Sequence, residues 1–141
     1  MTTKPKILFM CVANSCRSQM AEVLGHHYLG HKFDVYSAGS KPTQPNARAL
    51  KALKSCGYDT TALFLKSFDQ VPDDMDYVIS LCQEQELTCP TFPATVKVLA
   101  WPTPDPVSAS GQKNEIREFF TETLRSIEQK IIQFQQELSD N

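Results

Sequence analysis

The chain has 141 residues, which suits one domain over residues 1–141, and 41% of them are apolar, enough for a full core. Its formal net charge of −2 gives no reason to expect nucleic acid or an anionic membrane as the main partner. No apolar run approaches the ~20 residues of a membrane span, and the N-terminus lacks a signal-peptide pattern, so we expect a cytoplasmic protein.

Strands and helices alternate along the chain. Apolar runs predict strands at 6–10, 33–39, 76–82 and 95–101. Helical patterns begin at Arg17, Pro45 and Asn114; the first two end at Gly30 and Gly57. The last helix has a predicted inner stripe of Ile116, Phe119, Phe120, Thr123, Leu124, Ile127, Ile131, Phe134 and Leu138. This order predicts an α/β fold with a parallel sheet and helices on both faces, whose ligands bind beyond the carboxyl ends of the strands.

The cysteines and histidines do not form a metal-binding pattern. The cysteines are Cys11, Cys16, Cys56, Cys82 and Cys89. An odd number in a reducing compartment argues against a disulfide framework, and no C-x-x-C pair is present. The histidines, His26, His27 and His31, fall in or just after one helix and lack the spacing of a zinc site. We therefore expect neither a metal nor a cofactor, and Cys16 and Cys56 are interpreted as packing residues.

The loop after the first strand has the features of an anion-binding site. It joins Cys11, at the carboxyl end of that strand, to a helix that starts near Arg17. Amide groups at a helix start have no internal partner and attract anions, and a guanidinium fork fits two oxygens of a tetrahedral oxyanion. The predicted oxyanion-binding residues are Val12, Ala13, Asn14, Ser15, Cys16 and Arg17. The same field favours the thiolate of Cys11, although a buried cysteine followed by a surface arginine is the plain structural alternative.

The segments "CVANSCRS" (11–18), "VYSAG" (35–39), "GYD" (57–59), "VISLC" (78–82) and "DP" (105–106) resemble, in this order, the low-molecular-weight protein tyrosine phosphatase superfamily. The longer "NSCRSQMAE" is more similar to its arsenate reductase branch. The resemblance covers nearly the whole chain and implies a four-stranded parallel sheet. By position it implies that Cys11 is the nucleophile, Arg17 binds the oxyanion, Ser18 contacts the thiolate and Asp105 is the general acid. A carboxylic acid on a loop also suits the release of an oxygen leaving group, although a turn residue between prolines is the simpler interpretation of Asp105.

Cys82 and Cys89 have a spacing similar to that in thioredoxin-coupled arsenate reductases. The resemblance implies that Cys11 attacks arsenate, Cys82 then attacks Cys11, and Cys89 takes over the disulfide, which thioredoxin reduces. Phosphate and sulfate would compete with arsenate, and glutaredoxin stays open as a reductant. In a regular helix the Cα atoms of Cys82 and Cys89 would lie roughly 10 Å apart. A disulfide needs about 4.4–6.8 Å, so residues 82–89 must loop back or unwind.

Some members of this superfamily hold a potassium ion through groups that match Asn14, Glu22 and Ser37 and an additional acid. The additional acid aligns with Lys66, so we expect the lysine ammonium to replace the cation.

Two other functions stay open at this stage. One is a low-molecular-weight phosphatase, although "DPVSAS" lacks the aromatic pair that often follows the acid. The other is a non-catalytic oxyanion-binding protein that senses redox state through Cys82 and Cys89.

Overall fold

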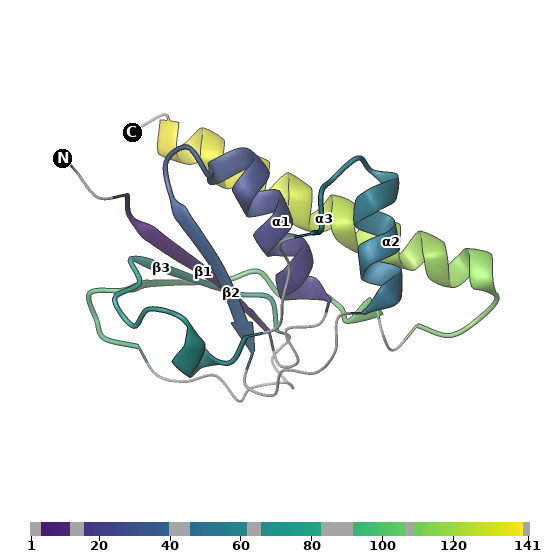
Figure 1. The fold of residues 1–141 in the computed structure, drawn as a ribbon, viewed down its shortest axis with the longest axis horizontal. Helices are drawn as coiled ribbons and strands as arrows, with labels where there is room; N and C mark the ends of the chain where they lie inside the picture. The colour runs from purple at the N-terminus through teal and green to yellow at the C-terminus, as the bar shows by residue number, and fades with distance from the viewer. Residues whose placement is uncertain are drawn as a thin grey trace.

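β1 lies inside a four-stranded parallel sheet with the strand order β2-β1-β3-β4, as Figure 1 shows for the three strands that it labels. The computed structural model describes residues 4–11, 16–39, 46–61, 66–82, 92–106 and 109–139. The strands are β1 (Lys6–Cys11), β2 (Asp34–Gly39), β3 (Tyr77–Ser80) and β4 (Lys97–Ala100). The predicted four-stranded parallel sheet is therefore confirmed, with strand ends within a few residues of those expected.

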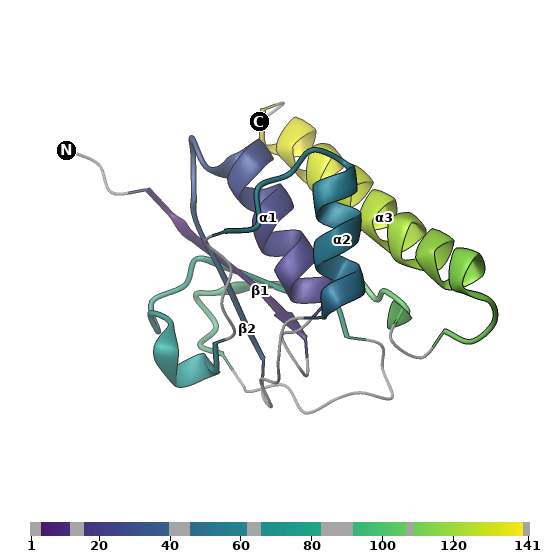
Figure 2. The same cartoon turned by 45° about the vertical axis from the view of Figure 1, so that its right-hand side comes forward.

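Helical segments lie on both faces of the sheet, as predicted, but the two layers differ in size. The α-helices are α1 (Arg17–Leu29), α2 (Ala47–Ser55) and α3 (Lys113–Ser139). All three lie on one side of the sheet (Figures 1 and 2). The other face is covered, among the described residues, by the 3-10 helix η1 (Phe68–Gln70) and by loop segments.

The side chains of β1 alternate between these two layers. Ile7 and Phe9 pack with the α-helices, whereas Leu8 and Met10 pack with the layer that contains η1. All four are almost completely buried. A strand that is apolar on both faces reads in the sequence as a continuous apolar run, which is why β1 was recognisable.

α1 is buried on nearly all sides in its first nine residues, because it lies between the sheet and the other two helices. A Cβ atom at Gly25 would lie 2.9 Å from the side chains of both Phe9 and Val35. Only glycine lets α1 approach the sheet this closely. The exposed side chains of α1 come near its C-terminal end and include His26 and His27.

α3 buries most of its predicted stripe against the sheet and α1. Phe119 differs from the prediction because its residue is 38% exposed. The adjacent Phe120 turns inward instead and is almost completely buried. Among the described residues, no helix is both long and apolar enough to cross a membrane.

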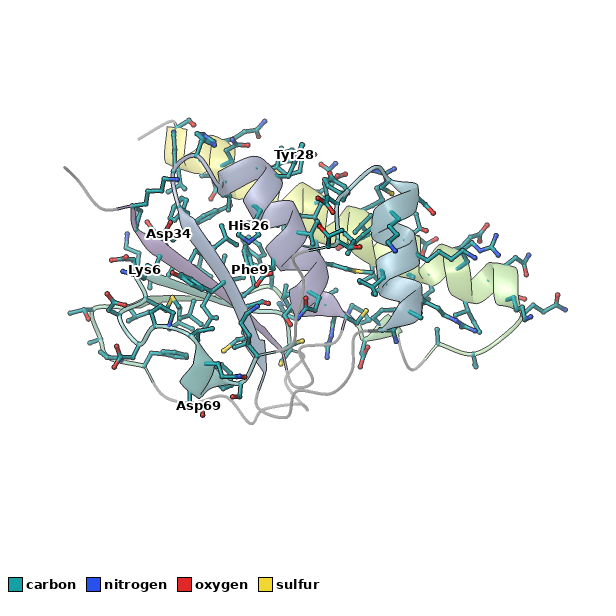
Figure 3. All side chains as sticks on the ribbon, in the orientation of Figure 1. Lys6, Phe9, His26, Tyr28, Asp34 and Asp69 are labelled. Atoms are coloured by element: carbon teal, nitrogen blue, oxygen red, sulfur yellow. The ribbon has the colours of Figure 1, made fainter. Side chains whose placement is uncertain are left out.

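A polar network ties α3 to α1 and to the segment after α2. The Glu128 carboxylate accepts hydrogen bonds from Tyr58 (2.6 Å) and Tyr28 (3.3 Å) and pairs with Arg125 (3.2 Å). Figure 3 shows Tyr28 at the end of α1 beside α3. Burial alone would raise the pKa of Glu128, but the hydrogen bonds from Tyr58 and Arg125 lower it below its ordinary value. The ionised carboxylate therefore stabilises the fold.

We expect Glu128→Gln to lower the free energy of unfolding at pH 7 by about 1–3 kcal/mol, because two partly buried hydroxyl donors lose a charged acceptor. A lowered pKa stabilises the fold fully above the ordinary value of 4.5, and this contribution disappears as the pH falls through the folded-state value. Urea unfolding of wild type and variant between neutral and acidic pH measures the difference, with the exposed Glu122→Gln as control. A deficit that stays constant down to acidic pH would contradict this assignment.

Candidate active site

Cys11 is the last residue of β1, and its buried sulfur faces the first turn of α1. The thiol donates a hydrogen bond to Ser18 Oγ over 3.0 Å. If Cys11 loses its proton, the hydroxyl of Ser18 becomes the donor and stabilises the thiolate. Cys11 and Ser18, which the family resemblance led us to expect in contact, are therefore in contact.

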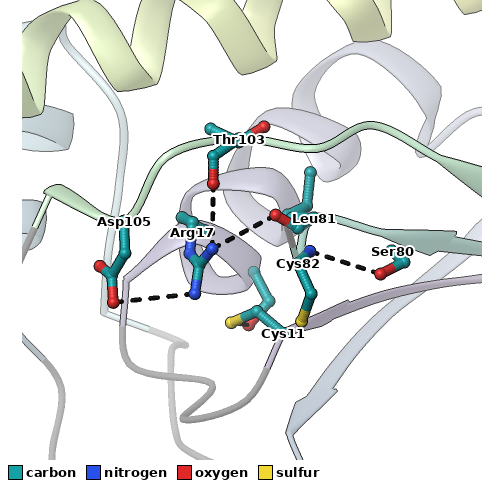
Figure 4. Close-up of polar contacts among 8 residues, drawn as sticks. Cys11, Arg17, Ser80, Leu81, Cys82, Thr103 and Asp105 are labelled. Atoms are coloured by element: carbon teal, nitrogen blue, oxygen red, sulfur yellow. Dashed lines mark hydrogen bonds and ion pairs between the residues drawn. The ribbon is translucent and has the colours of Figure 1, made fainter. Parts of the chain in front are cut away.

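Arg17, the first residue of α1, is only 3% exposed, and its guanidinium group is held by carbonyl groups. Nη1 donates to the carbonyl oxygen of Thr103 over 2.9 Å and to that of Leu81 over 3.3 Å (Figure 4). Nη2 lies 3.7 Å from Asp105 Oδ2. Neutral carbonyl groups orient the guanidinium fork without cancelling its charge, so this side chain is suited to bind an oxyanion.

Cys82 lies two residues beyond β3, at the same end of the sheet as Cys11. The Leu81 amide donates to the carbonyl oxygen of Met10 over 2.9 Å. The pairing between β1 and β3 therefore continues one residue past the end of β3. The Cys82 amide in turn donates to Ser80 Oγ over 3.3 Å, and the cysteine is buried. Figure 4 shows Cys11 and Cys82 at this shared end.

Asp105 follows β4 on a segment that is anchored to the end of β3. The Trp101 amide donates to the carbonyl oxygen of Ser80 (2.8 Å), and the Thr103 amide donates to that of Leu81 (3.2 Å). The Asp105 side chain is 39% exposed, in contrast to the buried Arg17 beside it. A carboxyl group that contacts both solvent and the site can exchange a proton with either. Cys11, Cys82 and Asp105 thus meet at one edge of the sheet, as the order of strands implies.

Thr103 and Lys130 are parts of this site that the sequence did not indicate. Thr103 is almost completely buried, and its hydroxyl donates to the carbonyl oxygen of Trp101 over 2.9 Å. Lys130 of α3 reaches the carbonyl oxygen of Pro102 (3.4 Å) and Thr103 Oγ1 (3.5 Å). Burial lowers the pKa of Lys130. These contacts involve mostly backbone atoms, so no motif of residue types signals them.

Cys16 and Cys56 have the packing roles that the sequence suggested. Cys16 lies in the core beside α1, and burial raises its pKa, as do the neighbouring Asp105 and Cys11, so it stays a neutral thiol. Cys56 is half-buried and packs against the same core. No cluster of metal-ligating side chains occurs in the described part of the chain.

Several predicted site residues lie outside the described residues, namely Val12, Ala13, Asn14, Ser15 and Cys89. Cys16 and Arg17 are the members of the predicted oxyanion-binding loop that the structure describes.

Lys66 forms a buried ion pair with Glu22. This is the place where we expected the lysine ammonium to stand instead of a potassium ion. The Lys66 ammonium lies 3.0 Å from Glu22 Oε1, which also accepts a hydrogen bond from Ser37 Oγ over 2.9 Å. Lys66 and Glu22 are both almost fully buried. The carbonyl oxygen of Lys66 accepts from the Gly39 amide (3.0 Å), which fixes this segment beside β2. The ammonium group thus supplies the positive charge that Glu22 needs.

A buried cysteine and a buried arginine lie at the carboxyl edge of a parallel sheet with a carboxyl group beside them, an arrangement suited to thiol-based chemistry on an oxyanion. The family model of low molecular weight phosphotyrosine protein phosphatase matches residues 6–141. The chain therefore belongs to this family, as the sequence predicted.

Curated relatives and solved structures place the chain near the arsenate reductases of this family. An arsenate reductase of Shouchella clausii is 40% identical over 117 residues, which cover 80% of this chain and 82% of the relative. A thioredoxin-dependent arsenate reductase of Corynebacterium glutamicum is 30% identical with a TM-score of 0.64, and the match covers 92% of this chain and 63% of that one. The tyrosine phosphatase Wzb of Escherichia coli K30, solved in complex with sulphate, shares the fold with a TM-score of 0.78 at 20% identity over 96% of this chain and 99% of that one.

We expect potassium to have no more effect than sodium on the melting temperature, because the Lys66 ammonium already neutralises Glu22.

Lys66→Met should lower the free energy of unfolding by about 3–5 kcal/mol, since it leaves a buried carboxylate without its partner. Thermal and urea unfolding in matched chloride salts measure both effects, and the exposed Lys54→Met serves as control. A melting shift of the wild type that is specific to potassium would show that a cation site persists.

Proposed function

We propose that this chain is a cytoplasmic enzyme that reduces arsenate to arsenite, with Cys11 as the nucleophile and thioredoxin as the electron donor. The arsenate reductase of Shouchella clausii supports the reaction, and a second relative supports it too: arsenate reductase 1 of Bacillus cereus is 42% identical over 107 residues. The thioredoxin-dependent arsenate reductase of Corynebacterium glutamicum supports the electron donor.

The position of Cys82 is the observation that carries this proposal. Hydrolysis of a phosphate ester needs a nucleophile, an oxyanion-binding group and an acid, which Cys11, Arg17 and Asp105 supply. A buried second thiol at the same end of the sheet as Cys11 has no task in that reaction. Reduction of arsenate needs two electrons, and a pair of thiols provides them when it becomes a disulfide.

In the first step, the Cys11 thiolate attacks arsenic while Arg17 and the loop amides bind the remaining oxygens. A hydroxide leaves as water with a proton from Asp105, and a bond between Cys11 Sγ and arsenic forms. Arsenic is still pentavalent at this point. Ser18 stabilises the thiolate before the attack through the contact described above.

In the second step, the Cys82 thiolate attacks Cys11 Sγ. The electron pair of the sulfur–arsenic bond passes to arsenic, arsenite leaves, and a Cys11–Cys82 disulfide remains. Cys89 then attacks Cys82, which frees Cys11 and leaves a Cys82–Cys89 disulfide. Dithiol exchange with thioredoxin returns both cysteines to thiols. Each arsenate that is reduced thus oxidises one thioredoxin.

Phosphatase activity is the competing function, since arsenate and phosphate have the same shape and charge and the phosphatase Wzb shares the fold. The deciding experiment compares arsenite release in the presence of thioredoxin and its reductase with hydrolysis of an aryl phosphate by the same preparation. We expect thioredoxin-dependent arsenite release. Hydrolysis of the aryl phosphate without arsenite release would overturn the proposal. The absence of both activities would favour the redox-sensing alternative.

Asp105→Asn should lower turnover by about 10²–10⁴-fold, because the leaving oxygen then has no positioned proton donor. The affinity for the oxyanion should change little, since Asp105 makes only a loose ion pair with Arg17, at 3.7 Å, through a side chain that is 39% exposed. Single-turnover arsenite release and phosphate binding separate the two effects. Wild-type turnover in the variant, under conditions where chemistry limits the rate, would exclude Asp105 as the acid.

Cys89→Ser should release about one arsenite per enzyme and then stall, because Cys11 and Cys82 complete only the first disulfide. Peptide mapping after alkylation should find residues 11 and 82 linked. Cys82→Ser is the matched comparison and should release little arsenite, since no other thiol is assigned to attack Cys11. Continued multiple turnover of Cys89→Ser with thioredoxin would contradict a three-cysteine relay.

A further inference from the structure

A cavity of about 220 Å³ lies between α2 and the N-terminal half of α3, away from the residues assigned to arsenate reduction. Figures 1 and 2 show α2 crossing this part of α3. Its floor contains two buried residues, Ala52 and Phe120, through which the two helices pack. Its walls are built by polar side chains of both helices, namely Arg48, Lys51, Ser55, Lys113, Arg117 and Thr121.

Each helix contributes two cations and one hydroxyl group to the cavity, at positions that share one helix face. On α3, Lys113, Arg117 and Thr121 are spaced four residues apart, and on α2, Lys51 and Ser55 have the same spacing. The two stripes therefore face each other across the cavity and bring four positive charges together. None of the described residues that line the cavity is acidic.

The charge of this cavity is not balanced within the part of the chain that the structure describes. None of its four cations forms an ion pair there. α2 has three basic residues and no acidic one, in a chain whose net charge is −2. Like charges that face each other repel, and an anion bound between them removes that repulsion. This arrangement favours a bound anion with more than one charge.

We propose that this cavity binds a compact organic phosphate through its phosphoryl group. A phosphate monoester carries close to two negative charges at neutral pH and offers three acceptor oxygens. Arg48 and Arg117 come from opposite walls and match these oxygens with planar donor forks. The small volume and the apolar floor at Phe120 suit a short organic body rather than a large ligand.

Ribose 5-phosphate, ribose and inorganic phosphate are suitable probes, followed by ¹H–¹⁵N NMR. This method separates the cavity, reported by amides of residues 47–55 and 113–121, from the catalytic edge, reported by amides of residues 17–19. We expect ribose 5-phosphate to cause saturable shifts at the cavity amides. Ribose should cause none, and inorganic phosphate should bind there more weakly because it lacks the organic body.

The double variant Arg48→Gln/Arg117→Gln should weaken ribose 5-phosphate binding at the cavity by about 100-fold, since two charged hydrogen-bonding partners are lost. Both side chains are exposed, so the fold should be retained, which the unchanged remainder of the spectrum would verify. Lys54→Gln is the matched control, because it removes one positive charge from α2 outside the cavity. It should bind ribose 5-phosphate like the wild type.

Four outcomes would overturn the proposal. The first is an absence of shifts at the cavity amides with ribose 5-phosphate, and the second is equal shifts in the double variant. The third is equal affinity for inorganic phosphate, which would mean a simple inorganic anion site. The fourth is a response of these amides to reduced thioredoxin but not to ribose 5-phosphate, which would identify a protein-docking surface instead.

Discussion

The arrangement of the candidate active site depends on the hydrogen bonds that the buried guanidinium group of Arg17 makes. This group bonds to backbone carbonyl groups 64 and 86 residues further along the chain, at Leu81 and Thr103. A buried charge is costly unless several polar partners surround it. The two hydrogen bonds satisfy this cation and hold the segments that follow β3 and β4 beside the start of α1. They thereby fix the positions of the residues in these two segments.

This constraint explains why Cys82 and Asp105 lie where the proposed reaction needs them. Cys82 directly follows Leu81, and Asp105 lies two residues after Thr103, so the two carbonyl bonds set the positions of both side chains relative to Arg17. Figure 4 shows the Arg17 side chain near Cys11, at the end of β1. One side chain thus links the proposed oxyanion site with the second thiol and with the acid. The Lys130 contact from α3 adds a further anchor to the acid segment.

Much of the fold could be predicted because its sequence patterns have simple physical causes. The run at 6–10 is apolar because β1 is covered on both faces, and the α3 stripe follows from burial along one face of a helix. Phe119 was misplaced because the periodic pattern does not fix the edge of the buried face, and in the structure this edge runs between the exposed Phe119 and the buried Phe120. Thr103, Lys130 and the Tyr58–Glu128 bond could not be predicted, since they depend on backbone positions and helix orientations that no local pattern encodes.

Hydrolysis of phosphate esters and reduction of arsenate share one step, the binding of a tetrahedral anion. We propose that Arg17 and the adjoining loop carry out this step at the edge of the sheet. Arsenate binding to Cys11→Ser, in which the anion binds without reacting, can be measured by calorimetry with Arg17 intact and with Arg17→Lys added. A lysine cannot keep both carbonyl bonds and a fork for the anion, so the added change should weaken arsenate binding by about 100-fold while the protein stays folded. Unchanged affinity in the Arg17→Lys protein would contradict the central claim that this guanidinium builds the oxyanion site.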